Sequence, residues 1–114
     1  MEVEFSAKLQ KCIGNKAQYL TRKAGHLSKP IKLRIDQIRA AANYREYQSI
    51  GLGKPHLLDG DFEGCFAVNV SKNYRLIGRL CVEDLRPESL EQCDKVVLEG
   101  VVDYHGKTST WIIP

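Results

Sequence analysis

The chain has 114 residues and a mass of 12.9 kDa, enough for one core but not for two, so we predict a single domain over residues 1–114. Apolar residues make up 43% of the sequence and charged residues 27%, and no stretch approaches the roughly 20 apolar residues of a membrane span. These values exclude the membrane class. The start of the sequence shows no basic and apolar leader, which predicts a cytoplasmic protein.

The net charge of +3 is distributed unevenly along the chain. Lysine and arginine dominate residues 8–45, whereas five acidic residues fall between Glu83 and Asp94. Without this acidic segment the body of the protein is basic, and a basic surface suggests an anionic partner such as nucleic acid. A charge that serves only solubility is an equally good interpretation of the same pattern.

The cysteines and histidines do not indicate a metal site. The four cysteines lack the close pairing of zinc ligands and are expected to be reduced, small apolar residues: Cys12, Cys65, Cys81 and Cys93. Cys81 and Cys93 flank one loop, so a bridge between them under oxidising conditions is the alternative. The three histidines lie too far apart for a local metal motif, and we expect no cofactor.

The amino-terminal part of the chain predicts one strand followed by helices. Residues 2–5 alternate between apolar and acidic, which is typical of a half-buried strand, and Ser6 is placed to cap a helical turn. A helix is expected from about residue 15 to 24, ended by Gly25. Ser28 is expected to cap the strongest helix, in which isoleucines and an alanine recur at helical spacing up to Ala42.

The second half of the chain predicts mainly sheet. One helical turn is expected at residues 44–47, before glycines and Pro55 break regular structure. Three strands then follow as an antiparallel meander: 65–70, 74–80 and 96–105. The acidic segment 83–94 is interpreted as a long connection, and the apolar tail 106–114 is expected to dock on the body or to form an interface with a partner or second copy.

This element order predicts an α+β fold. Two or three amino-terminal helices are expected to cover one face of a compact antiparallel sheet of about four strands. The other face of the sheet is then left partly open. We expect the functional residues to lie there.

The end of the last predicted strand carries three consecutive groups that exchange protons or hydrogen bonds, Asp103, Tyr104 and His105. Alternation along a strand sends Asp103 and His105 to one face and Tyr104 to the other. Such groups on a rigid strand suit proton-transfer chemistry. The alternative is that Tyr104 anchors the core while its two neighbours are solvated.

Three groupings carry a family resemblance: Gly60-Asp61-x-x-Gly64, Asn73-Tyr74-Arg75 and Asp103-Tyr104-His105, preceded by Lys54 and His56. From its first strand to His105 the sequence resembles the RelE/ParE superfamily of bacterial toxins, and within it the HigB-like killer-protein branch. The resemblance implies a compact ribonuclease-type fold and a ribosome-dependent mRNA endonuclease, or mRNA interferase. It also implies a toxin–antitoxin system in which a small helix-turn-helix antitoxin of the HigA type neutralises the toxin.

Metal-free RNA cleavage defines the roles that these residues would fill. The ribose 2′-hydroxyl attacks the adjacent phosphorus, so one group accepts its proton, another donates to the leaving oxygen, and a fixed cation stabilises the phosphoryl oxygens. Arg75 suits the cation because its planar fork matches phosphate geometry. His105 and His56 suit the proton transfers, with Asp103 supporting the site and Tyr104 stacking on a base or bracing the strand.

Three further cations are expected to contact phosphates. Lys54 and Lys72 are expected to supply phosphate contacts, and Arg79 lies on the same strand face as Arg75. Each of the two lysines is alternatively a solvated side chain. Arg79 is alternatively a contact to a partner protein, and Arg75 a surface ion pair.

Two positions depart from the family pattern and keep other functions open. Asp59 stands where HigB-like toxins commonly carry lysine, and Ser71 stands where they often carry a basic residue. Both changes make the predicted cleft less cationic, although Lys72 is placed to compensate. The alternatives are a catalytically weak or inactive binding protein of the same fold and a gyrase-directed toxin of the ParE type.

Overall fold

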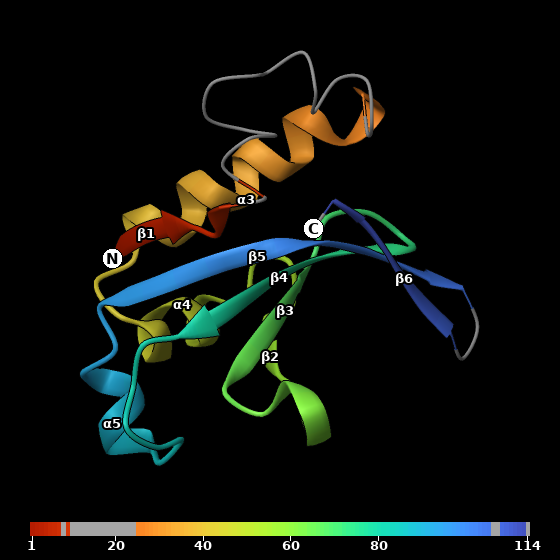
Figure 1. The fold of residues 1–114 in the computed structure, drawn as a ribbon. Coiled ribbons are helices and arrows are strands. Elements are labelled where there is room, and N and C mark those ends of the chain that lie inside the picture. The colour runs from red at the N-terminus through yellow and green to blue at the C-terminus, as the bar shows by residue number, and fades with distance from the viewer. Residues whose placement is uncertain (8, 10–24, 106–107, 114) are drawn as a thin grey trace.

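A computed structural model describes residues 1–7, 9, 25–105 and 108–113 of the chain. In this part, six strands form one sheet and the longest helix lies across one of its faces (Figure 1). The strands are β1 (Glu2–Phe5), β2 (His56–Leu57), β3 (Cys65–Asn69), β4 (Tyr74–Leu80), β5 (Lys95–His105) and β6 (Thr108–Ile113). The helices are η1 (Gly25–Leu27), α3 (Ser28–Ala40), α4 (Tyr44–Ile50), η2 (Gly60–Phe62) and α5 (Pro87–Glu91). The helix predicted for residues 15–24 lies outside the described residues.

The strand order is β1-β5-β4-β3-β2, and β6 pairs with the far end of β5. The 11-residue strand β5 therefore has β4 along one edge and shares its other edge between β1 and β6. The predicted α+β fold is confirmed. The sheet is larger than predicted and mixed, because β1 runs parallel to β5 whereas all other pairs are antiparallel.

The core lies between the helices and one face of the sheet. Ile31, Ile35 and Ile38 of α3 are buried, as their helical spacing predicts, and they share one cluster with sheet residues such as Phe66 and Leu98. Burying each such side chain contributes about 1.5–3 kcal/mol. Tyr44 adds an aromatic contact, with its ring centroid 5.1 Å from that of Phe66. The helices therefore fix the position of the sheet from one side only.

Helix α4 is longer than the single predicted turn because both of its ends are capped. At its start, the Asn43 side-chain oxygen accepts a hydrogen bond from the Glu46 N–H at 2.9 Å. At its end, Gly51 takes a left-handed conformation with φ of 79°. These two caps extend the helix to Ile50. In α3, by contrast, the N-cap position is taken by Leu27 rather than by the predicted Ser28, which lies inside the helix.

Two segments that were predicted without regular structure form elements. Within the acidic connection, Pro87 begins the short helix α5, where its missing N–H costs nothing. The apolar tail forms β6 and pairs antiparallel with β5, so the prediction that it docks on the body is confirmed. No helix in the described part of the chain is both long and apolar enough to cross a membrane.

We call the side of the sheet that the helices leave uncovered the open face. Its buried centre is a small cluster of Ala67, Ile77 and Val102, with Leu58 and Cys65 packed against it. A bulge in the β4–β5 pairing between Ile77 and Gly78 leaves Glu99 without a partner in the ladder. Gly78 is required there, because a Cβ on it would lie 2.5 Å from a ring carbon of Phe66.

Candidate functional site on the open face

The open face brings Arg75 and Tyr104 together. Arg75 lies opposite Val102 in the β4–β5 ladder, and its guanidinium carbon lies 5.6 Å from the centre of the Tyr104 ring. The Tyr104 N–H donates a 2.6 Å hydrogen bond to the Asn73 carbonyl, which fixes the end of β5 against the turn before β4. A cation and an aromatic ring are thus held side by side on rigid strands.

The turn before β4 holds the Arg75 guanidinium in place. Its Nη1 donates to the carbonyl oxygens of Ser71, Lys72 and Tyr74 at 3.1, 3.2 and 3.1 Å. A guanidinium carries five N–H donors, and these three contacts use only those of Nη1. Ser71 therefore supports Arg75 through its backbone, whatever its side chain. The remaining donors match the planar bidentate geometry of a phosphate.

The register of the ladder separates Asp103 from Arg75. Asp103 lies directly opposite Tyr74, and Tyr74 packs against the helix-covered core and the His26 ring. Asp103 and Tyr74 therefore share one face, and Arg75 is on the other. His105 ends β5 opposite Thr108, and its side chain lies outside the described part of the structure. Of the predicted triplet, Tyr104 is the member that the structure places beside Arg75.

His56 shares the open face but stands apart from Arg75. It lies opposite Ala67 and is exposed, and its Nδ1 is 3.1 Å from the Lys54 carbonyl oxygen. Strand β2 is two strands away from β4, a separation of about 10 Å between backbones. A histidine at that distance reaches a different atom of a bound polymer from the one that Arg75 contacts.

The two predicted lysines lie on exposed turns. Lys54 has a left-handed backbone with φ of 54°, unusual for a residue with a side chain, and its N–H donates to the Gly51 carbonyl at 2.9 Å. Lys72 is exposed in the turn whose carbonyls bind Arg75. Both are free to move toward an anion, but neither is fixed in the way that Arg75 is.

Arg79 forms an ion pair that the sequence did not predict. Its Nη2 lies 2.8 Å from Oε1 of Glu99, the residue at the bulge. This pairing offsets part of the charge that Arg79 would present to a phosphate. The signal for Glu99 was a single carboxylate inside an otherwise apolar run. Beside the pair, burial and then the Glu99 carboxylate raise the pKa of the Cys65 thiol, which favours its protonated form.

The sequence did not assign two aromatic residues to the site. Phe62 was missed, and Trp111 was expected only to dock on the body as part of the tail. Phe62 of η2 and Trp111 of β6 come from opposite ends of the sheet, yet their ring centroids are 6.3 Å apart. Together they border a narrow hollow of about 20 Å³ on the open face. The hollow is lined by Leu58, Phe62, Ile77, Val102, Tyr104 and Trp111.

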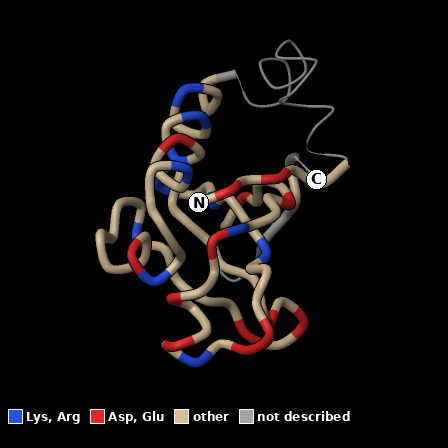
Figure 2. Tube along the Cα trace, turned by 90° about the vertical axis from the view of Figure 1, so that its left-hand side faces the viewer, with Lys and Arg blue, Asp and Glu red and all other residues tan. Residues whose placement is uncertain are grey.

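Charge is arranged differently on the two sides of the molecule. Figure 2 shows basic residues following one another along α3, where Asp36 is the acidic exception, and several acidic residues in the loops at the far end of the molecule from this helix. Near the candidate site, Asp59, Asp61 and Glu63 are all exposed in and around η2. The open face thus has a cation at Arg75 and carboxylates at the turn that carries Phe62.

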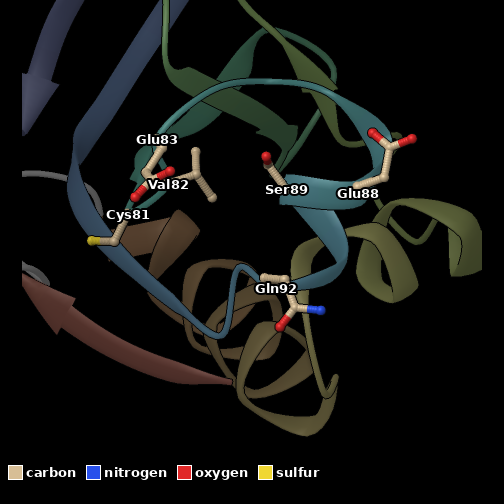
Figure 3. A pocket seen from close by; sticks show the side chains of 6 residues that line it. All are labelled: Cys81, Val82, Glu83, Glu88, Ser89 and Gln92. Carbon is tan, nitrogen blue, oxygen red and sulfur yellow. The ribbon is translucent and has the colours of Figure 1, made fainter.

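A larger hollow elsewhere lacks the groups for such chemistry. It has a volume of about 450 Å³ and lies between the end of β4 and α5 (Figure 3). Its lining includes Glu83 and Glu88 but no cation, and Figure 3 shows the Cys81 sulfur directed away from the other lining side chains. Among the described residues, no cluster of three or more histidine, cysteine or acidic side chains is arranged to hold a metal ion.

Comparison with solved structures shows that the fold is RelE/YoeB-like. A YoeB/ParE toxin from Agrobacterium tumefaciens superposes with a TM-score of 0.57, at 15% identity over 92% of this chain and 99% of that one. YoeB from Staphylococcus aureus, in a complex with YefM, gives 0.55 at 15% identity, over 92% and 97%. A point mutant of YafQ from E. coli gives 0.52 at 15% identity, over 88% and 89%.

These matches concern the fold alone at such low identity, and they do not single out the HigB-like branch. No family model matches the sequence, and no curated protein matches it either.

Proposed function

We propose that this protein is the toxin of a type II toxin–antitoxin system and cleaves mRNA on the ribosome without a metal. The support is the toxin fold together with a guanidinium and an aromatic ring held on its open face. RNA is an anionic polymer that suits such a pair. The guanidinium binds a phosphate, and the aromatic ring stacks on an unpaired base. The cytoplasm is where this substrate is found.

The contact between Arg75 and Tyr104 carries the proposal. In the reaction, a 2′-hydroxyl attacks the adjacent phosphorus, the bond to the 5′-oxygen breaks, and a cyclic phosphate and a 5′-hydroxyl are left. Arg75 stabilises the phosphoryl oxygens as charge develops on them, and its three carbonyl contacts hold it in place beforehand. Tyr104 stacks on a neighbouring base and keeps the scissile phosphate beside the guanidinium.

The proton transfers are proposed for histidines. His56 is the candidate that lies on the open face. His105 is the second candidate: strand alternation assigns its position at the end of β5 to the face of Asp103, so it serves only where the strand end turns toward the phosphate. Asp103 supports the strand end from the other face rather than the phosphate. Lys54 and Lys72 contribute phosphate contacts from their exposed turns.

Partner proteins are proposed from the same fold. Solved structures with this fold include a YoeB–YefM complex and a YoeB dimer, both from Staphylococcus aureus. We propose that a small antitoxin, of the helix-turn-helix HigA type, neutralises this protein, and that a second copy is the alternative partner.

The test is induced expression in a bacterium without the antitoxin, followed by mapping of mRNA ends. We expect wild type to arrest growth and cut translated transcripts, and Arg75→Ala to lower cleavage by about 100-fold or more. Arg75→Lys keeps the charge but loses the fork, so an intermediate rate is expected. Arg45→Ala is the control, since Arg45 pairs with Glu91 on the surface of α4 and α5. Intact transcripts with wild type, or equal cleavage by Arg75→Ala, would contradict the proposal.

A catalytically inactive binding protein is the second candidate. Two observations favour it: Asp103 lies on the face opposite Arg75, and Glu99 offsets the charge of Arg79. This candidate predicts a stable complex with an antitoxin-like protein and no RNA cleavage. Co-expression with the product of a neighbouring small gene, followed by the same mapping of mRNA ends, separates the two.

A further inference from the structure

Three large rings remain partly uncovered around the hollow on the open face. Phe62 is 44% exposed, Trp111 40% and Tyr104 36%. Each ring also lines the hollow above Ile77 and Val102, so one side of each is packed and another is in water. Large aromatic surface kept in water on one small area marks a binding site for a flat or apolar group.

The spacing of Phe62 and Trp111 fits a flat group. Their ring centroids are 6.3 Å apart and their planes are tilted by 45°. Placing a planar ring between two others requires about 7 Å, since each stacking interval is about 3.5 Å. A small reorientation of the two side chains therefore admits one planar ring, whereas the hollow beneath, at about 20 Å³, holds no more than a water.

The charges around the three rings differ between the two sides of the group, with a cation on one side and carboxylates on the other. Arg75 contacts Tyr104 at one side of the group, and a guanidinium there favours a phosphate. Phe62 lies in a turn with exposed carboxylates at Asp59, Asp61 and Glu63. Carboxylates repel phosphate but accept hydrogen bonds from the amino groups of bases. The ligand that matches this order has an anion at one end and a flat, amino-bearing ring at the other.

We propose that Phe62 and Trp111 form a stacking site for one unpaired nucleobase of RNA, with a preference for amino-bearing bases over uracil. The site deepens the proposed function and rests on it for the identity of the polymer. In this site, Phe62 and Trp111 determine specificity without taking part in bond breaking. The base stacks on Trp111, Phe62 closes the other side, and the adjoining phosphate lies toward Arg75.

Trp111 makes this site directly observable, because it is the single tryptophan of the chain. The full-length protein is titrated with hexamers of 2′-O-methyl adenosine, cytidine and uridine, which cannot be cleaved through a 2′-hydroxyl. We expect saturable quenching of Trp111 fluorescence by the adenosine and cytidine hexamers and weaker quenching by the uridine hexamer. Phe62→Ala is expected to weaken binding about 10-fold, as loss of one stacking partner does.

The control is Leu33→Ala, because Leu33 is an apolar residue of α3 that is 52% exposed and lies away from the open face. Equal binding by Phe62→Ala and Leu33→Ala, or no quenching by any hexamer, overturns the inference. A shift of Trp111 emission with protein concentration and without RNA also overturns it, since the rings then bind a second copy of the chain.

The outcomes separate the inference from the nuclease proposal. If hexamers quench Trp111 but translated mRNA stays intact, the nuclease proposal fails and the base site stands. The opposite result is that wild type, Phe62→Ala and Trp111→Phe all cut mRNA at the same sites and that no hexamer quenches Trp111 fluorescence. The base site then fails and the nuclease proposal stands.

Discussion

The two faces of the sheet differ in how much of their apolar surface is covered. The face under α3 and α4 buries large side chains such as Phe66, Tyr44 and Ile35 completely or almost so. The open face has a buried centre of only three small or medium residues, and its largest rings stay partly in water. One face therefore supplies stability, and the other retains uncovered apolar surface and a fixed cation that a ligand can use.

Two phenylalanines give the largest test of this contrast. Phe66→Ala removes a fully buried ring that contacts Tyr44 and Tyr47, and we expect it to lower the free energy of unfolding by about 3–5 kcal/mol. The same change at Phe62 removes an exposed ring and is expected to cost no more than about 1 kcal/mol. Urea denaturation of both variants measures the difference. Similar losses would show that the open face is also structural.

The bulge gives a smaller effect with an internal control. A Cβ at position 78 would lie 2.5 Å from the Phe66 ring, so Gly78→Ala is expected to destabilise the fold by about 1–3 kcal/mol through overpacking. In a Phe66→Leu background the ring carbons that clash are absent. The cost of Gly78→Ala should then fall, and an unchanged cost in a double-mutant cycle would place the strain elsewhere.

The buried tyrosines make the stability of the fold depend on pH under alkaline conditions. Burial raises the pKa of Tyr47 to about 12, with Arg34 acting in the opposite direction. A raised folded-state pKa means that the folded state keeps the proton, so the contribution of Tyr47 to stability is fully present below pH 10 and is lost as the pH rises toward 12. Tyr47→Phe removes this ionisation, and its stability should depend less on pH in that window. Thermal melts at about pH 9 and about pH 11 are the measurement, and parallel pH dependence in both proteins would refute the role of Tyr47.

The contrast between the faces also explains what the sequence could and could not predict. The period of Ile31, Ile35 and Ile38 predicts α3 and its buried side, because local spacing decides both. Strand β2 escaped prediction because two residues give no period, and the parallel pairing of β1 with β5 joins segments from opposite ends of the chain. The covered face was therefore predicted better than the edges of the sheet.

The site was predicted in part because its residues lie on strands whose register is not local. The sequence identified Arg75 and Tyr104. Their position on one face follows only from the strand register, in which Tyr74 pairs with Asp103. A register shifted by one residue would have placed Asp103 beside Arg75 instead. The contact between Phe62 and Trp111 depends on how η2 and β6 meet across the sheet, which no spacing within the sequence encodes.

The position of β5 has a consequence for synthesis of the protein. This strand lies between β4 and the two strands β1 and β6, and of these only β6 is synthesised after it. Until β5 leaves the ribosome, β1 lacks the strand with which it pairs among the described residues, and Tyr104 and Trp111 are not yet available to the open face. Folding of the site must therefore follow synthesis of β5 and β6. If the protein attacks translating ribosomes, this order protects the ribosome that is making it until both strands have emerged.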